Sequence, residues 1–327
     1  MKKDSKISRR SALTTGLKVT AAGLIGFGFK PEENRSSQTG KIYKEKLPFR
    51  VSLNTSTLMA YKLPVDEQID LVGDAGFDGI ELWMRDITSF VEKGGSLVSL
   101  KEKLQSHNLV LENIIAFSKW CSDDTNERAA ALELMRSEMT MIAKLGGQYF
   151  AAPVQGIEKI DPNKYEAYAQ RYADILKVGD ELGVVPLIEL WGMGALHKVS
   201  DCAKIVIESK HPKAAMLLDF YHVHRGGNSW NTIGTLNAAR LPVIHMNDYP
   251  GSPATELLTD ADRVLPGEGV CPFDEVLPKL YAAGFRGGLS VELFNKGYWE
   301  SMDAETLLKK SYETTLQTIE KAMPNFK

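Results

Sequence analysis

From residue 49 to its C-terminus, the chain alternates short apolar runs with longer amphipathic stretches. Eight of the apolar runs have the length of β-strands, and they cover residues 49–54, 78–83, 109–115, 148–152, 184–190, 214–219, 242–247 and 287–293. Between them, apolar residues recur at helical spacing, most clearly over 65–75 and 126–145. Strands that alternate with helices form parallel sheets. The pattern therefore predicts an α/β fold.

One structural unit recurs along the chain. Residues 75–82 (AGFDGIEL) and 283–293 (AGFRGGLSVEL) both combine a helix end, a glycine, a strand and a glutamate. An open doubly wound sheet is the alternative, but no GxGxxG follows the first strand. Eight units favour closure into a (β/α)8 TIM barrel. No change in composition divides residues 48–327, so we expect a single domain. The longest non-periodic segment, 248–270, is expected to cover the catalytic face.

Four consecutive predicted strands end in side chains that can bind metals. The fifth to eighth strands are apolar until, near their carboxyl ends, they reach Glu189, Asp219, His245 and Glu292 respectively. Barrel strands are buried on both faces, so a charged side chain is costly there unless it faces a site. The carboxyl ends of barrel strands meet on one face, where the active site lies. We therefore expect these four side chains to converge.

Three carboxylates gathered with one imidazole repel one another unless a cation neutralises them. Two glutamates, one aspartate and one histidine suit Mn²⁺, Zn²⁺, Co²⁺ or Fe²⁺ better than Ca²⁺. The sequence thus predicts one divalent metal ion at Glu189, Asp219, His245 and Glu292. The alternative is a metal-free barrel in which some of these side chains pair with Arg or Lys.

Three further residues are candidates for substrate binding. Glu81 ends the second predicted strand, and we expect a substrate-binding or ion-paired carboxylate rather than a fifth ligand. His222 lies three residues after Asp219, where a turn would bring it to the site; a structural histidine is the alternative. Trp83 stands at a strand end, where rings often form the floor of sugar sites, although packing explains it nearly as well.

The first 30 residues have the layout of an export signal. Several lysines precede the Arg9-Arg10 pair, and residues 12–29 are apolar and rich in glycine, with Lys18 among them. Paired arginines before a weakly hydrophobic stretch are typical of a twin-arginine signal. A retained membrane anchor is the alternative, but such a stretch is a poor membrane span. We expect a periplasmic protein with a signal over 1–30, a polar linker over 31–47 and a catalytic domain over 48–327.

Charge and cysteine content exclude other classes. Of 39 Lys and Arg and 42 Asp and Glu residues, seven bases and one acid lie in residues 1–30. The remainder has 32 bases and 41 acids, which gives a net charge of about −9 and little affinity for nucleic acid. The three cysteines lie far apart, without the spacing of a zinc finger or a disulfide framework. The expected partner is a small-molecule carbohydrate or cyclitol.

The order of the strand-end residues resembles that of the xylose-isomerase-like TIM-barrel superfamily of sugar isomerases and epimerases. Within it, the 2-keto-myo-inositol (inosose) isomerase group is most similar at LLDFYHVH (217–224), IHMND (244–248), TDADRVLPGEG (259–269) and SVELF (290–294). The similarity runs over residues 49–320, and the DADRVLPGEG loop is its most specific part.

The resemblance implies roles for individual residues. It makes Glu189, Asp219, His245 and Glu292 the metal ligands, with His222 and Arg263 in contact with substrate. It also implies an isomerase or epimerase of a keto-cyclitol or keto-sugar. A cation that bridges the carbonyl and hydroxyl oxygens of a 2-hydroxy ketone acidifies the C–H bond between them. Glu189 and Glu292 would then pass protons as base and acid through an enediolate.

Two other functions remain open. The same enolate could expel a glycosidic oxygen, which would make the protein an exported lyase or hydratase of 3-keto-glycosides. A non-catalytic sugar-binding barrel is the third possibility. The related ketose 3-epimerases carry a second Glu and an Arg where this chain has Ala195 and Gly251, so their substrate contacts do not transfer.

Overall fold

The apolar runs form eight strands in the computed structural model, each within two residues of its predicted limits. They are β1 (Arg50–Asn54), β2 (Gly79–Trp83), β3 (Val110–Ile115), β4 (Tyr149–Pro153), β5 (Val185–Glu189), β6 (Ala215–Asp219), β7 (Val243–Met246) and β8 (Gly288–Val291). The structure describes residues 47–326. The predicted signal segment, 1–30, and all but the last residue of the predicted linker, 31–47, lie outside this range.

Helices connect the strands. The α-helices are α2 (Val65–Asp74), α3 (Met84–Glu92), α4 (Leu97–Ser106), α5 (Thr125–Leu145), α6 (Tyr165–Leu182), α7 (Val199–Glu208), α8 (Phe220–Arg225), α9 (Phe273–Ala282), α10 (Lys296–Ser301) and α11 (Ala304–Ala322). Short 3-10 helices are η1 (Thr55–Tyr61), η2 (Trp230–Thr235), η3 (Ala238–Arg240), η4 (Thr255–Leu257), η5 (Asp260–Asp262) and η6 (Pro324–Phe326). None of these described helices is both long and apolar enough to cross a membrane.

Local sequence sets the ends of the long helix α5. Asp124 precedes it and accepts hydrogen bonds from the backbone N–H groups of Asn126 and Glu127, two donors that lack partners within the helix. Gly146 follows it with a φ of 89°, a conformation that glycine adopts without strain. The helix predicted over 126–145 therefore forms almost at its predicted limits.

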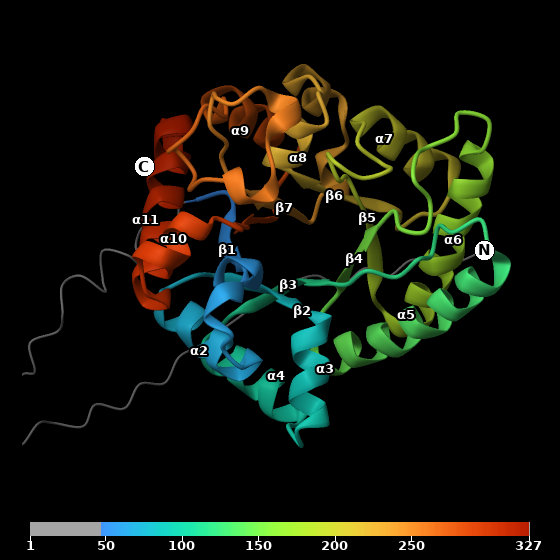
Figure 1. Cartoon of the computed structure of the whole chain (residues 1–327), viewed down its shortest axis with the longest axis horizontal. Coiled ribbons are helices and arrows are strands. Elements are labelled where there is room, and N and C mark those ends of the chain that lie inside the picture. The colour runs from blue at the N-terminus through green and yellow to red at the C-terminus, as the bar shows by residue number, and fades with distance from the viewer. Residues whose placement is uncertain (1–46, 327) are drawn as a thin grey trace, which may run out of the picture. The chain divides into compact units, whose positions relative to one another are not determined.

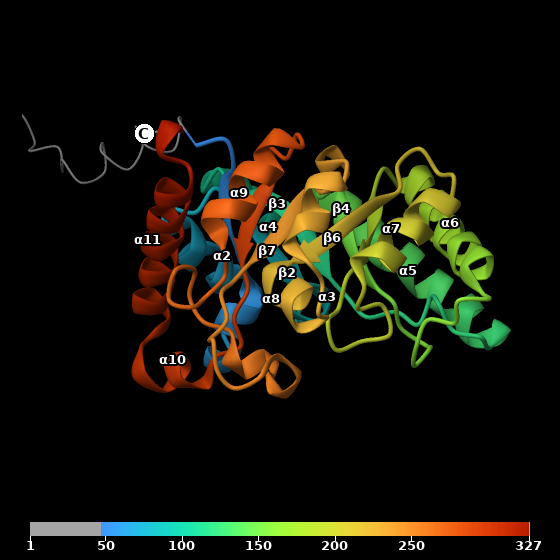
Figure 2. The same cartoon turned by 90° about the horizontal axis from the view of Figure 1, so that it is seen from above.

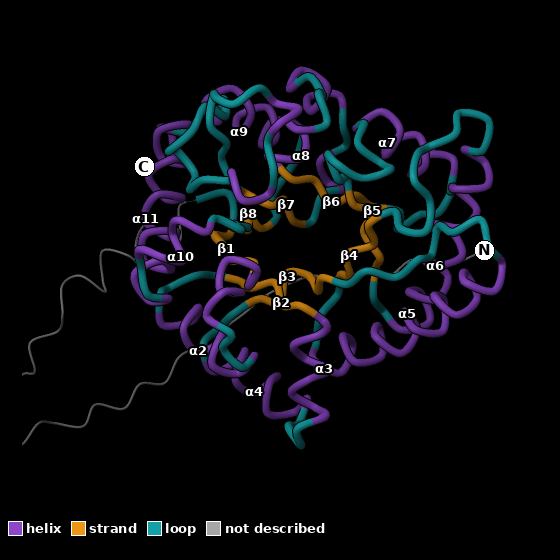
Figure 3. The backbone as a smooth tube through the Cα atoms, in the orientation of Figure 1, coloured by secondary structure: helices purple, strands orange, loops and turns teal. Residues whose placement is uncertain are grey.

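The strands form a ring in the order β3-β2-β1-β8-β7-β6-β5-β4, and all paired neighbours are parallel. The two ends of this order, β3 and β4, lie side by side, and the helices surround the ring (Figures 1 and 3). The described residues thus form the predicted (β/α)8 TIM barrel.

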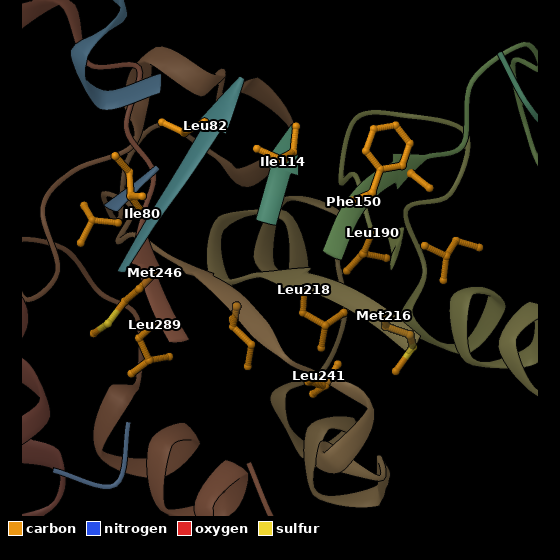
Figure 4. Packing of buried hydrophobic residues seen from close by; sticks show 14 of the residues in the cluster. Ile80, Leu82, Ile114, Phe150, Leu190, Met216, Leu218, Leu241, Met246 and Leu289 are labelled. Atoms are coloured by element: carbon orange, nitrogen blue, oxygen red, sulfur yellow. The ribbon is translucent and has the colours of Figure 1, made fainter. Parts of the chain in front are cut away.

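Side chains alternate between two apolar layers. Those that point outward pack against the helices, as Ile80, Leu82 and Leu218 do (Figure 4). Those that point inward form a smaller cluster, which includes Leu187 and Leu217. A strand residue two positions further along points the same way. The strand-end side chains that follow the inward cluster therefore also face the inside of the barrel, at its carboxyl-terminal mouth.

Candidate metal centre and catalytic site

Three of the four predicted metal ligands meet at this mouth. Asp219 ends β6 and pairs in register with His245 in β7, while Glu292 directly follows β8. One ligand atom from each residue lies within 4.8 Å of the other two. His245 Nδ1 is 3.1 Å from Glu292 Oε2 and 3.5 Å from Asp219 Oδ2. Helices α8 and α10, which follow β6 and β8, lie at this end of the barrel (Figure 2).

The fourth predicted ligand, Glu189, lies outside that group of ligand atoms. It ends β5, which is the neighbour of β6, and the residue is 9% exposed. No described residue forms a hydrogen bond with its carboxyl group. Burial raises the pKa of Glu189 to about 8; the charges of Glu292 and Asp219 act in the same direction, against that of His245. Glu189 is therefore a carboxyl group beside the cluster that has no hydrogen-bond partner within residues 47–326.

Glu81 holds His245 from the side opposite to the other carboxylates. His245 Nε2 lies 3.1 Å from Glu81 Oε2, and Asn113 Nδ2 donates to the same oxygen over 2.9 Å. All three residues are fully buried. Burial acts to raise the pKa of Glu81, but the imidazole and these hydrogen bonds outweigh it and bring the pKa below its usual value. Of the two roles expected for Glu81, the ion-paired carboxylate is the one that this geometry favours.

Arg263 reaches the cluster from the long loop between β7 and α9. Its Nη1 donates to Asp219 Oδ2 over 2.7 Å and to Glu292 Oε2 over 2.6 Å, and its Nη2 donates to Asp260 Oδ1 over 2.8 Å. Burial acts to lower the pKa of Arg263, but these carboxylates outweigh it and raise the pKa. Two of the predicted ligands therefore have a guanidinium partner, as the metal-free alternative requires.

One guanidinium does not balance the charge of the site. Glu81, Asp219 and Glu292 bring three buried carboxylates against one arginine and one imidazole, and the carboxyl group of Glu189 lies beside them. The imidazole Nδ1 is buried and has no hydrogen-bond partner among the described residues, although two carboxylate oxygens lie close to it. An imidazole nitrogen beside two carboxylate oxygens is a donor set for a divalent transition metal ion. The residues therefore fit such an ion.

His222 offers an unused hydrogen-bond donor beside this cluster. Its backbone N–H donates to Asp219 Oδ1 over 2.8 Å, which places the ring in the first turn of α8. Arg263 Nη2 donates to ring Nε2 over 3.0 Å, so we assign the proton to Nδ1. Burial lowers the pKa of His222 to about 3, so the ring is neutral. Nδ1 is buried and has no partner among the described residues.

Trp83 is tied to the cluster through an asparagine. Its Nε1 donates to Asn54 Oδ1 over 3.1 Å, and Asn54 Nδ2 donates to Glu292 Oε1 over 3.0 Å. Asn247 likewise donates to Asp219 Oδ2 over 3.0 Å. Neither asparagine is among the site residues predicted from the sequence. Both stand at or just beyond the carboxyl end of an apolar run, so the rule that selected the predicted ligands would have found them had it included amides.

Asp248 fastens the loop that carries Arg263. Its carboxylate accepts four backbone hydrogen bonds of 2.8 to 3.0 Å, from Tyr249, Gly267, Gly269 and Cys271. The backbone of Asp248 also pairs with that of Val264, the residue after Arg263. A Cβ atom on Gly269 would lie 2.4 Å from Asp248 Oδ1, so this close approach requires glycine. One carboxylate thus fixes both ends of the loop.

We expect Asp248→Asn to loosen this loop and to raise KM. An amide replaces an acceptor with a donor, which leaves up to two backbone N–H groups without partners, at about 1–3 kcal/mol each. Limited proteolysis should cut the variant faster within 250–262, and turnover should fall while metal content stays near that of the wild type. Asp274→Asn, an exposed position at the start of α9, is the matched control. Unchanged proteolysis and KM would show that the loop is held by other contacts.

Comparisons with known proteins agree with this architecture. The family model described as "Xylose isomerase-like TIM barrel" matches residues 69–318. An inosose isomerase of Halalkalibacterium halodurans is 25% identical over 252 residues, which cover 75% of this chain and 88% of the relative. An inosose isomerase of Bacillus velezensis is 26% identical over 262 residues, 78% of this chain and 92% of the relative.

Solved structures share the fold. The IolI protein, whose crystal structure is described as having a binding zinc atom, superposes with a TM-score of 0.77 at 22% identity, over 84% of this chain and 99% of IolI. An L-ribulose 3-epimerase superposes with a TM-score of 0.68 at 16% identity, over 85% of this chain and 96% of the epimerase. The family model covers most of the barrel, and the chain therefore belongs to the xylose isomerase-like TIM-barrel family.

Proposed function

We propose that the protein is a divalent-metal-dependent isomerase or epimerase of a keto-cyclitol or keto-sugar. The observation that carries this proposal is the buried group of Asp219, His245 and Glu292, whose ligand atoms lie within 4.8 Å of one another. Two relatives named inosose isomerase, which align over most of this chain, support the substrate class.

The site divides into groups that bind the substrate and groups that move protons. When bound, a divalent ion at Asp219, His245 and Glu292 supplies an electrophile that polarises a substrate carbonyl. Glu189 borders these ligands with a carboxyl group that forms no hydrogen bond with a described residue, so it is available to exchange a proton with substrate. His222 Nδ1–H, buried and without a partner, suits a substrate hydroxyl or carbonyl oxygen.

Proton transfer between the substrate and two carboxylates accounts for the proposed reaction. Glu189 and Glu292 belong to strands separated by β6 and β7 in the ring, so they approach a bound substrate from different sides. One carboxylate removes the proton from the hydroxyl-bearing carbon next to the carbonyl, and an enediolate results. Return of the proton to the former carbonyl carbon, with transfer of the hydroxyl proton to the former carbonyl oxygen, isomerises the sugar. Return to the opposite face of the carbon that lost the proton epimerises the sugar.

A lyase of 3-keto-glycosides is the second candidate. Removal of the proton next to the ketone gives an enolate. If the neighbouring carbon carries a glycosidic oxygen, its C–O bond breaks, a C=C bond forms and a proton goes to the leaving oxygen. The neighbouring aromatic rings of Trp83, Phe117 and Trp191 favour a substrate larger than one sugar ring.

A substrate screen tests the proposal. The purified, metal-loaded protein is incubated with inososes, ketohexoses and 3-keto-glucosides, and the products are followed by NMR. We expect a new isomer or epimer from at least one of the first two classes, and none from protein treated with a chelator. Release of the aglycone alone would favour the lyase. Binding without conversion of any compound would favour the non-catalytic sugar-binding barrel.

We also propose that residues 1–30 direct export by the twin-arginine route, on the strength of Arg9-Arg10 and the weakly apolar stretch after them. Replacing both arginines by lysine should leave folded, metal-loaded protein in the cytoplasm, as cell fractionation and immunoblotting would measure. A matched control exchanges Lys2 and Lys3 for arginine, which keeps the charge, and should be exported normally. Export of the double lysine variant at the wild-type level would instead indicate the general secretory route or a membrane anchor.

A further inference from the structure

Three aromatic rings form a row beside the cluster. The ring centroids of Trp83 and Phe117 lie 5.5 Å apart, and those of Phe117 and Trp191 lie 6.1 Å apart. The row continues to the imidazole of His222, 6.3 Å from Trp191. Phe117 and Trp191 follow β3 and β5, so the rings come from the same carboxyl-terminal mouth as the predicted ligands.

Both ends of the row are joined to the cluster. At one end, Trp83 donates a hydrogen bond to Asn54, which in turn donates to Glu292. At the other end, His222 accepts a hydrogen bond from Arg263. The row is therefore a continuation of the candidate site rather than a separate surface. The contacts run from Glu292 at one end to Arg263 at the other. Phe117 is the middle ring and is separated from the nearer of these charged groups by more contacts than either tryptophan is.

Phe117 is also unusually exposed. It is 47% exposed, more than any other aromatic residue among residues 47–326. Single apolar residues on a surface are common and need no explanation. Here, however, the exposed ring stands between two tryptophans that lead to buried catalytic candidates. Aromatic side chains present flat apolar surfaces, which suit the flat or ring-shaped apolar faces of ligands.

The charged side chain next to the row, Arg85, is already paired, which indicates that the row binds an uncharged ligand. The Arg85 guanidinium lies 4.3 Å from the centroid of the Trp83 ring. Its Nε is also 3.6 Å from Asp86 Oδ1, so this cation already has an acidic partner. The charge of Arg85 is therefore not left for a ligand to neutralise. The groups suited to a ketone and hydroxyls, by contrast, lie in the cluster.

We propose that Phe117, flanked by Trp83 and Trp191, binds the second ring of a keto-glycoside whose keto-sugar ring occupies the metal cluster. This inference rests on the proposed function for the position of the keto-sugar. The second ring is uncharged, and it presents either an aromatic face or the C–H face of a sugar. A free keto-sugar lacks this second ring and would contact the metal cluster alone.

Calorimetric titration of the metal-loaded protein tests this subsite with two matched ligands. Phenyl 3-keto-β-D-glucoside carries the second ring, and 3-keto-D-glucose lacks it. Phe117→Ala should weaken binding of the phenyl glycoside roughly twofold to tenfold, since a ring contact contributes about 0.5–1.5 kcal/mol beyond its buried area. Binding of 3-keto-D-glucose should not change. Phe117→Tyr should keep the wild-type affinity for both ligands.

A control variant and two further ligands complete the experiment. Leu134→Ala removes an equally exposed apolar side chain from α5, and it should change neither affinity. Phenyl β-D-glucoside, which has no ketone, should also lose affinity in Phe117→Ala. This arm reports on the ring subsite even if no keto-sugar is converted. Cellobiose in place of phenyl β-D-glucoside distinguishes a sugar ring from an aromatic one as the preferred occupant.

The outcomes separate the two proposals. Equal loss of affinity for both keto-sugars in Phe117→Ala would overturn the subsite, since Phe117 would then shape the first ring site. So would equal affinity of the wild type for ligands with and without the second ring. If no keto-sugar is converted but Phe117→Ala still weakens binding of the phenyl glucoside, the subsite stands and the proposed reaction fails.

Discussion

Replacing His245 by alanine should remove the bound divalent ion and reduce turnover to background. Its Nδ1 lies between two carboxylate oxygens and is the only nitrogen in the described ligand group. A catalytic site keeps a coordination position open for substrate, so it has no spare ligand to replace a lost one. Elemental analysis of the wild-type protein should find about one divalent transition ion per chain, and of the variant almost none.

The controls separate loss of metal from loss of fold. His211→Ala removes an imidazole that pairs with Asp180, near the C-terminal end of α6, and it should keep both metal and activity. Asp219→Ala should also lose the metal, but it removes the helix cap at His222 and a partner of Arg263 as well, so it is the less specific variant. Full metal occupancy in both His245→Ala and Asp219→Ala would refute the metal centre.

The convergence of ligands could be predicted because it follows from topology. The carboxyl ends of parallel barrel strands meet on one face whatever the details of packing. An apolar run that ends in Asp219 or His245 is enough to place that side chain at the mouth, and the register of β6 and β7 then brings the two together. The strand limits could be predicted for a similar reason, because buried parallel strands are continuous apolar runs.

The partners within the site could not be predicted in this way. Glu81 stands at a strand end like the ligands, but its carboxylate contacts the rear of His245, and only the three-dimensional arrangement of β2 and β7 across the barrel decides this. Arg263 comes from an irregular loop, whose path depends on the four hydrogen bonds of Asp248. Such contacts join residues far apart in sequence and leave no periodic signal.

The aromatic row illustrates the same limit. A tryptophan at a strand end, such as Trp83, could be selected from sequence, but so could Trp120, which is 2% exposed and donates its Nε1 hydrogen bond to the backbone of Pro153. Phe117 gives no signal in the sequence, because its exposure depends on how the segment after β3 runs. Burial therefore separates the tryptophan that packs from the ring that is free to bind.

Glu189→Gln should lower turnover by roughly 10² to 10⁴, the usual contribution of a general acid or base. Glutamine keeps the shape of the side chain but cannot carry the transferred proton. Because no described residue hydrogen bonds with the Glu189 carboxyl, the substitution breaks no hydrogen bond among residues 47–326. The variant should therefore keep its melting temperature and most of its metal, while kcat falls.

Glu292→Gln should reduce turnover at least as much, but for mixed reasons. Its Oε1 accepts from Asn54 and its Oε2 accepts from Arg263, so an amide must present its NH₂ group to one of two donors. We expect weaker metal binding and a lower melting temperature in this variant. Comparison of the two glutamine variants thus separates proton transfer, which both lack, from ligand and ion-pair effects, which only Glu292→Gln should show.

Deuterium incorporation connects these variants with the reaction itself. A C–H bond next to the carbonyl must break if an enediolate forms, so product or recovered substrate from D₂O should carry deuterium at that carbon. The exchange should slow in Glu189→Gln in proportion to turnover. A hydride shift would retain the substrate's own hydrogen and give no deuterium incorporation. A carboxylate shielded from water could return the same proton, and that would also give no incorporation. Because of that overlap, absence of label alone decides nothing. Near-normal turnover in both glutamine variants, together with no incorporation, is the result that would leave proton transfer by Glu189 and Glu292 without support.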